Sequence, residues 1–91
     1  MKTYAHFTEN GVSQTGSDAW YQLDSRNTLE TQKRDARDRL HALRFVKPWY
    51  NGFEIHKGES LRQTRCIYAV TGIDPRFARD SVLDNPAPAL A

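Results

Sequence analysis

The sequence contains a single cysteine, Cys66, among its 91 residues. One cysteine excludes an internal disulfide framework and a zinc site of the CxxC type. No uninterrupted apolar run approaches the roughly 20 residues that a membrane-spanning helix needs. The opening residues, MKTYAHFTENG, lack the apolar segment of a secretory signal. These absences predict a cytoplasmic protein with no membrane partner.

The sequence also lacks the motifs that mark several common chemistries. It has no Walker pattern, no GxxG loop and no RNP-type signature. Its soft metal ligands are His6, His41, His56 and Cys66, and no two of them have HxxxH or CxxC spacing. His6 and His56 would be neighbours only if their two strands paired, which the sequence does not show. We therefore expect no metal, no cofactor and no catalytic residue.

An enzyme built on Glu54, His56 and Cys66 is the competing interpretation. A nucleophilic thiol needs a base beside it and an environment that activates it. Neither is visible around Cys66, whose place in an alternating pattern is typical of a small buried or half-buried apolar residue. The sequence therefore favours a protein without enzymatic activity.

The residues that are present suffice for one small folded domain. Hydrophobic residues make up 38% of the chain and aromatic residues 11%, a composition unlike that of a disordered protein. The net charge of +2 is unevenly distributed, because residues 25–73 carry ten Lys or Arg against five acids while both flanking segments are net acidic. The middle of the chain is therefore expected to form a positive surface.

Alternating polar and apolar residues predict four strands, at residues 2–8, 19–23, 50–56 and 62–70. Asn10-Gly11 marks a turn after the first strand, because both residue types tolerate positive φ. The segment Lys57-Gly58-Glu59-Ser60 is predicted as the turn between the last two strands. In the last strand, Cys66, Tyr68 and Val70 are expected to share one face.

A helix is predicted between the second and third strands. Residues 28–44 contain no Gly or Pro, and Asn27 followed by Glu30 has the spacing of a capping box. The apolar stripe of this helix consists of Leu29, Ala36, Leu40 and Leu43. Pro48 prevents the helix from continuing beyond Lys47. A second, short helix is expected at residues 75–84, followed by a frayed tail.

The order β-β-α-β-β predicts an α+β fold, in which a small antiparallel sheet packs one face against the helix. Residues 1–73 would form the domain, and residues 74–91 a short helix and flexible tail. The sheet side chains expected to face the helix are Phe7, Tyr21, Leu23, Phe53 and Ile55. Those expected on the other face are Tyr4, His6, Trp20, Glu54 and His56. An open sheet edge permits either a monomer or a homodimer.

Candidate partner-binding residues come from the helix, the segment after it and the last hairpin. They are Arg37, Arg44, Trp49, Tyr50, Lys57, Arg62 and Arg65. Trp, Tyr and Arg are the residue types enriched in binding hot spots. On the hairpin, basic residues interleaved with aromatic ones either stack bases and hold phosphates or keep edge strands from aggregating. Trp49 either is exposed and contacts a partner, or packs under the end of the helix and closes the core.

In size and sheet-plus-helix layout, residues 2–70 resemble the small accessory proteins of bacteriophages and mobile elements, among them several anti-CRISPR proteins. The resemblance implies stoichiometric binding to a host complex, such as a CRISPR-Cas effector, in the host bacterial cytoplasm. Mimicry of DNA is disfavoured because this chain is mildly basic. The sequence thus predicts a phage-encoded protein-binding inhibitor of host defence. The alternative is a small nucleic-acid-binding regulator that uses the basic and aromatic hairpin.

Overall fold

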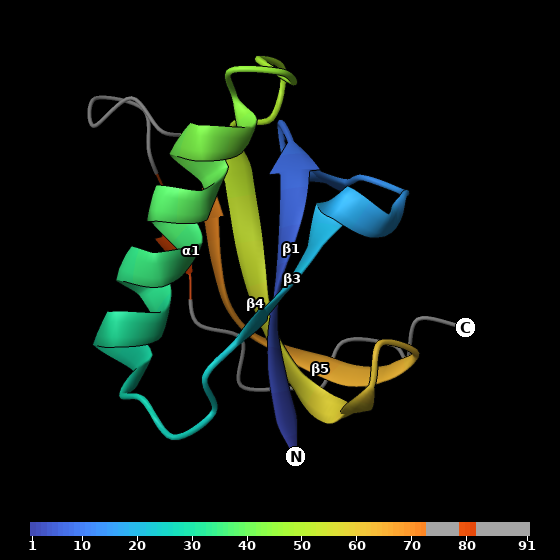
Figure 1. Cartoon of the computed structure of the whole chain (residues 1–91), viewed down its shortest axis with the longest axis vertical. Coiled ribbons are helices and arrows are strands. Elements are labelled where there is room, and N and C mark those ends of the chain that lie inside the picture. Colours follow the sequence, from blue (N-terminus) through green and yellow to red (C-terminus); the bar gives the residue numbers. More distant parts are fainter. Residues whose placement is uncertain (73–78, 82–91) are drawn as a thin grey trace.

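The computed structural model describes residues 1–72 and 79–81. The elements along the chain are β1 (Lys2–Glu9), β2 (Val12–Ser13), the 3-10 turn η1 (Ser17–Ala19), β3 (Trp20–Leu23), α1 (Leu29–Leu43), β4 (Gly52–Ser60), β5 (Gln63–Thr71) and β6 (Arg79–Ser81). The strands form one curled antiparallel sheet, and α1 lies across one of its faces (Figure 1). The predicted α+β class is confirmed.

The sheet has the order β2-β1-β4-β5-β6, and β3 pairs with β1 on the edge that β2 also uses. Strand β1 therefore pairs with β4 along its length, although α1 and β3 separate them in sequence. The predicted β-β-α-β-β order is retained with two short additions, β2 and β6. Residues 79–81 are a strand, so the short helix predicted at 75–84 is wrong there, because the chain pairs with the edge of β5. The rest of the predicted helix and tail lies outside the described residues.

The turn after β1 forms as its sequence predicts. Asn10 and Gly11 have φ of 51° and 84°, the left-handed values that a tight hairpin requires. The turn is also tied to the start of β4, because the Asn10 backbone N–H donates to Asn51 Oδ1 at 2.8 Å and Asn51 Nδ2 donates to Asn10 Oδ1 at 2.7 Å. These reciprocal bonds fix the β1–β2 corner against β4.

Helix α1 begins one residue later than the predicted capping box requires. The N-cap is Thr28, whose Oγ1 accepts a bond from the Thr31 backbone N–H at 3.3 Å. The Asn27 backbone N–H closes a turn onto the Asp24 carbonyl at 3.1 Å, so it does not donate to Glu30 as the predicted capping box requires. Gln32 is buried on the first turn, and its Nε2 donates to the carbonyls of Asp24 and Asn27. The turn before the helix is thereby part of the helix start.

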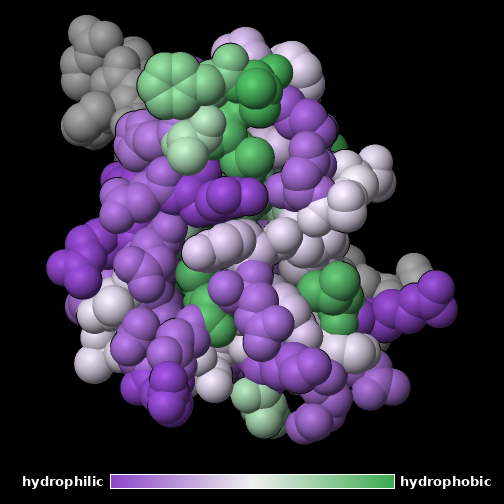
Figure 2. All heavy atoms as spheres, viewed as in Figure 1, coloured by the Kyte–Doolittle hydropathy of each residue, from purple (hydrophilic) through white to green (hydrophobic). Residues whose placement is uncertain are grey.

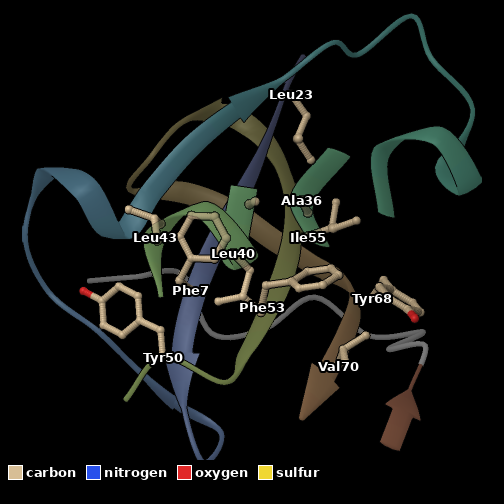
Figure 3. Close-up of a cluster of buried hydrophobic side chains, with 11 residues drawn as sticks. Phe7, Leu23, Ala36, Leu40, Leu43, Tyr50, Phe53, Ile55, Tyr68 and Val70 are labelled. Carbon is tan, nitrogen blue, oxygen red and sulfur yellow. The ribbon is translucent and has the colours of Figure 1, made fainter. Parts of the chain in front are cut away.

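The core lies between α1 and the sheet, as Figure 3 shows. It consists of Ala5, Phe7, Leu23, Ala36, Leu40, Leu43, Tyr50, Phe53, Ile55, Tyr68 and Val70. Two expectations need correction. Tyr21 faces α1 but is 38% exposed, because β3 is an edge strand and Arg39 covers only one side of the ring. Tyr50, predicted to contact a partner, is 2% exposed and lies parallel to the ring of Phe7.

The β4–β5 hairpin turns later than predicted. Residues 57–60 are not a turn, because β4 continues to Ser60 and the chain reverses at Leu61 and Arg62. Gly58 misled the prediction, since a glycine within a strand marks close backbone approach as well as a turn. A methyl group at Gly58 would overlap the backbone carbonyl oxygen of Gln63 and lie 2.7 Å from Thr64 Cα. The hairpin register also shifts between Gly58 and Ser60.

A second register shift in this hairpin moves Cys66 to the other face of the sheet. Tyr68 pairs with Ile55, whereas Cys66 pairs with His56, so Ile67 is left over as a bulge. Residues directly opposite each other share a face. Tyr68 therefore joins the core with Ile55, while Cys66 lies on the side of His56. The prediction that Cys66 and Tyr68 share one face is wrong, because period-2 alternation fails across a bulge.

Candidate functional site

Three polar side chains gather on the sheet face opposite α1. The antiparallel register places His6 opposite Glu54, and Tyr4 opposite His56. One nitrogen or oxygen from each of His6, Glu54 and His56 lies within 4.8 Å of the others. We call these residues the His-Glu cluster. The sequence left this pairing open, and the structure settles it by placing β4 next to β1.

His6 is held in a defined tautomer. Its Nε2 lies 2.7 Å from the backbone carbonyl oxygen of Gln14, which only accepts, so Nε2 carries the proton and donates it. Nδ1 of the neutral ring is therefore an unprotonated lone pair. This atom is buried and has no hydrogen-bond partner within residues 1–72 and 79–81, and His6 as a whole is only 4% exposed.

His56 and Glu54 are joined to each other. His56 Nε2 lies 3.0 Å from Glu54 Oε1, and His56 Nδ1 lies 3.0 Å from Thr64 Oγ1. Glu54 Oε1 also accepts a bond of 3.4 Å from Ser13 Oγ on β2. Each member of the cluster is thus oriented by a neighbour from a different strand or turn.

Burial and hydrogen bonding set the charges in the cluster. Burial lowers the pKa of His6, and the bond to the Gln14 carbonyl offsets this only in part. The hydrogen bond from His56 lowers the pKa of Glu54 against the opposing effect of its burial. At neutral pH the cluster therefore holds a neutral His6 and an ionised Glu54.

Trp20 covers the cluster. Its ring stacks on His6 with centroids 3.8 Å apart and an angle of 18° between planes, and it meets His56 edge-on at 5.5 Å. Beside Trp20 is a pocket of about 330 Å³, lined by Tyr4, Gly16, Ser17, Trp20, Gln22 and Leu61. Trp20 therefore lies between the His-Glu cluster and a partly apolar hollow at the surface.

Cys66 is not an activated nucleophile. Its side chain is buried, its Sγ donates to the Tyr68 carbonyl at 3.3 Å, and burial together with the nearby Glu54 charge raises the pKa of the thiol to about 11. We expect the native thiol to react with a disulfide reagent at pH 8 at least about 100-fold more slowly than the protein unfolded in guanidinium, since each pKa unit reduces the thiolate tenfold. Absorbance of the released thiol measures both rates. Equal rates would contradict this placement.

A second feature is an exposed apolar patch just after α1, consisting of Phe45, Val46 and Trp49. Their exposed fractions are 91%, 71% and 48%. Figure 2 shows apolar side chains gathered over this end of the helix. Of the two alternatives that the sequence left open for Trp49, the structure shows the exposed one, whereas Phe45 and Val46 were not singled out from the sequence. The sequence feature that could have indicated them is a pair of apolar residues beyond the last leucine of the helix and before Pro48.

Hydrogen bonds hold the segment that carries this patch. The backbone N–H groups of Val46 and Lys47 both donate to the Leu43 carbonyl, at 3.1 and 2.8 Å. The Arg44 guanidinium donates to the Tyr50 carbonyl, and Lys47 forms an ion pair with Asp18. Arg44 and Lys47 therefore bind the loop to the rest of the domain. The exposed side chains of Phe45, Val46 and Trp49 are carried by an ordered segment.

The predicted basic residues lie in separate places. Arg37 is half-buried on α1, and Arg44 donates to the Tyr50 carbonyl in the loop after the helix. On the hairpin, Lys57 lies directly opposite Arg65, with Arg62 at the turn. None of these three hairpin residues forms an ion pair within the described part of the chain. Lys57 and Arg65 also line a pocket of about 320 Å³ with Met1 and Ile67.

Comparison with known proteins does not assign this chain to a family. No protein-family model matches the chain, and no curated protein or solved structure matches it significantly. Within residues 1–72 and 79–81, no helix has the length and apolar content needed to cross a bilayer. The resemblance to anti-CRISPR proteins stays a prediction, and the function is to be inferred from the side chains themselves.

Proposed function

We propose that this chain is a non-enzymatic binding protein that docks onto another protein through the Phe45–Val46–Trp49 patch. The observation that carries the proposal is the exposure of Phe45 and Val46, at 91% and 71%, on a loop closed by hydrogen bonds. Burying two such side chains together contributes about 3 kcal/mol or more to association. A pre-ordered loop loses little further entropy on binding.

The partner surface has a definite chemistry. A shallow hollow of about 160 Å³ beside Phe45 is lined by His41 and Arg44. Arg44 uses one N–H to bind the Tyr50 carbonyl. Because a guanidinium has five N–H donors, others are available to an acceptor on the partner. A complementary partner would therefore offer an apolar depression with a carboxylate at its rim.

The narrower proposal concerns the identity of the partner. The resemblance in size and layout to phage accessory proteins suggests a bacterial defence complex, with a CRISPR-Cas effector as the first target to test. Stoichiometric binding by a small basic domain would inhibit such a complex by covering a working surface. This part of the proposal is supported by the resemblance and by the absence of a catalytic motif in the sequence.

Pull-down from bacterial lysate, with and without nuclease, tests the proposal when the wild type is compared with a Phe45→Ala/Trp49→Ala variant. We expect a defined protein partner that survives nuclease, and at least a tenfold weaker affinity for the variant, since about 1.4 kcal/mol of lost contact suffices. The affinity is measured by interferometry with the purified partner.

The control for this comparison is Val12→Ala, which removes apolar surface from β2 at a side chain that is 65% exposed. Both variants are expected to keep the wild-type melting temperature within a few degrees, because surface truncations usually change stability by less than about 0.5 kcal/mol. An unchanged affinity in the double variant would contradict docking through the patch.

A second candidate function is nucleic-acid binding by the hairpin. The observation that favours it is the pairing of Lys57 with Arg65, since like charges directly opposite each other destabilise a sheet unless an anion lies between them. Phosphates of a nucleic acid would supply that anion. Loss of every captured protein after nuclease treatment would favour this function over protein docking.

A further inference from the structure

We propose that His6, Glu54 and His56 form a binding site for a divalent transition-metal ion of the Zn²⁺ class, which ties β1 to β4. The site lies on the sheet face opposite α1, whereas the Phe45–Val46–Trp49 patch lies at the end of α1. The inference therefore goes beyond the proposed docking function and does not depend on it.

The ligand set suits such an ion. Two imidazole nitrogens and one carboxylate oxygen are a combination that Zn²⁺ takes with bond lengths near 2.0–2.2 Å. Tetrahedral geometry then places neighbouring ligand atoms about 3.3 Å apart. One nitrogen from each histidine and one carboxylate oxygen of Glu54 already lie within 4.8 Å of one another. The ligand atoms would therefore have to approach one another by at most about 1.5 Å to reach tetrahedral spacing.

The partners outside the cluster are those that a metal site requires. A ligating histidine donates its second N–H to a carbonyl or another acceptor, which fixes the ring and its tautomer. His6 donates Nε2–H to the Gln14 carbonyl, which leaves Nδ1 for the ion. With its proton on Nδ1 and donated to Thr64 Oγ1, His56 would exchange the hydrogen bond between Nε2 and Glu54 for a bond from Nε2 to the ion. Ser13 Oγ holds the Glu54 carboxylate.

Hydrogen bonding among the three side chains, without an ion, explains only part of this arrangement. The His56–Glu54 hydrogen bond accounts for two members of the cluster. It leaves His6 Nδ1 buried and without a partner among the residues described, a condition that is costly for a polar atom. An ion placed between His6 Nδ1, His56 Nε2 and Glu54 Oε1 would satisfy that lone pair and neutralise the carboxylate.

The enclosure of the site points to a structural ion. His6 and His56 are 4% and 3% exposed, and Trp20 stacks on His6. The Glu54 side chain, 25% exposed, is the one member with access to solvent. A fourth ligand would therefore be a water molecule beside Glu54, and the ion would join two strands that are distant in sequence.

Zn²⁺ titration of chelator-treated protein tests the proposal by calorimetry and thermal unfolding. We expect one ion per chain, and a melting temperature raised by about 10 °C or more when free Zn²⁺ is 100 times its Kd. The Trp49→Phe variant adds an optical signal, because Trp20 is then the only tryptophan and lies against His6. Co²⁺ should quench the fluorescence of Trp20, and the wild-type site and its variants should rank in the same order of Kd by fluorescence as by calorimetry.

Variants locate the ion. Glu54→Gln is expected to raise the Kd for Zn²⁺ by roughly 100-fold, and the isosteric Thr64→Val by about tenfold or more. His41→Ala is the control, because it removes an exposed histidine on α1 and should leave the Kd unchanged. His6→Gln should abolish binding. If that variant does not fold, Glu54→Gln alone still decides the question.

Two results would overturn the proposal. One is the absence of heat, thermal shift and fluorescence change with Zn²⁺ and Co²⁺ in the folded wild type. The other is binding that persists unchanged in Glu54→Gln, or that disappears in His41→Ala, since the ion would then lie elsewhere. Either result leaves docking through the Phe45–Val46–Trp49 patch untouched.

Discussion

Gly58→Ala is expected to lower the free energy of unfolding by about 4 kcal/mol or more. The added methyl group would overlap the backbone carbonyl oxygen of Gln63 and lie 2.7 Å from Thr64 Cα, so no side-chain rotation relieves the clash. Strand β5 would have to move away from β4 along the bulged part of the hairpin. Chemical denaturation followed by far-UV circular dichroism measures the loss.

Gly11→Ala is the matched control for this glycine. A methyl group at Gly11 meets nothing closer than the Thr71 side chain at 3.9 Å, but the residue has a φ of 84°. The left-handed conformation alone costs about 1–2 kcal/mol in a residue with a side chain. Gly58→Ala should therefore be the more damaging variant by a clear margin. Equal losses, or a smaller loss at Gly58, would contradict the continuation of β4 through this residue.

Phe53→Ala is expected to cost about 3–5 kcal/mol of stability, the range for a phenylalanine removed from a packed core. The ring is fully buried on β4, opposite Val70 and near the Tyr68 ring. Domains of this size unfold with about 5–15 kcal/mol in total. The variant should therefore lose much of its stability margin, and its melting temperature should fall by more than about 12 °C.

The same substitution at Phe45 provides the comparison. Phe45 is 91% exposed, so Phe45→Ala removes no buried contact and should change stability by less than about 0.5 kcal/mol. Differential scanning calorimetry of the two variants gives both values under one set of conditions. A large loss in Phe45→Ala would show that this side chain is packed in solution, and it would remove the basis for the docking surface.

Local features of the fold could be predicted from the sequence because they depend on neighbouring residues. The Asn10–Gly11 turn, the stripe Ala36–Leu40–Leu43 and the first strand all follow from short-range patterns. The hairpin turn could not be placed correctly, because Gly58 has the same local signal in a turn as in a strand with close backbone approach. Tyr50 was misassigned because its burial under the loop depends on packing against Phe7.

The candidate sites divide in the same way. The sequence left the exposure of Trp49 open, whereas the opposite sheet face was predicted to carry His6, Glu54 and His56. That these three converge depends on β1 pairing with β4, a long-range choice that no spacing motif encodes. Cys66 reached their side of the sheet through a bulge at Ile67, which the alternating pattern gave no reason to place.

The pairing of β1 with β4 also requires one step of folding with a large entropic cost, the closure of the long loop between these two strands. Strands β4 and β5 are joined by a short turn and can form a hairpin within microseconds. Strand β1 has to close a loop that contains β3 and the whole of α1 before its contacts with β4 compensate for the lost chain entropy. The histidine from β1 therefore meets the glutamate and histidine from β4 only after this closure, so the cluster exists only in chains that have completed the longest-range step of folding.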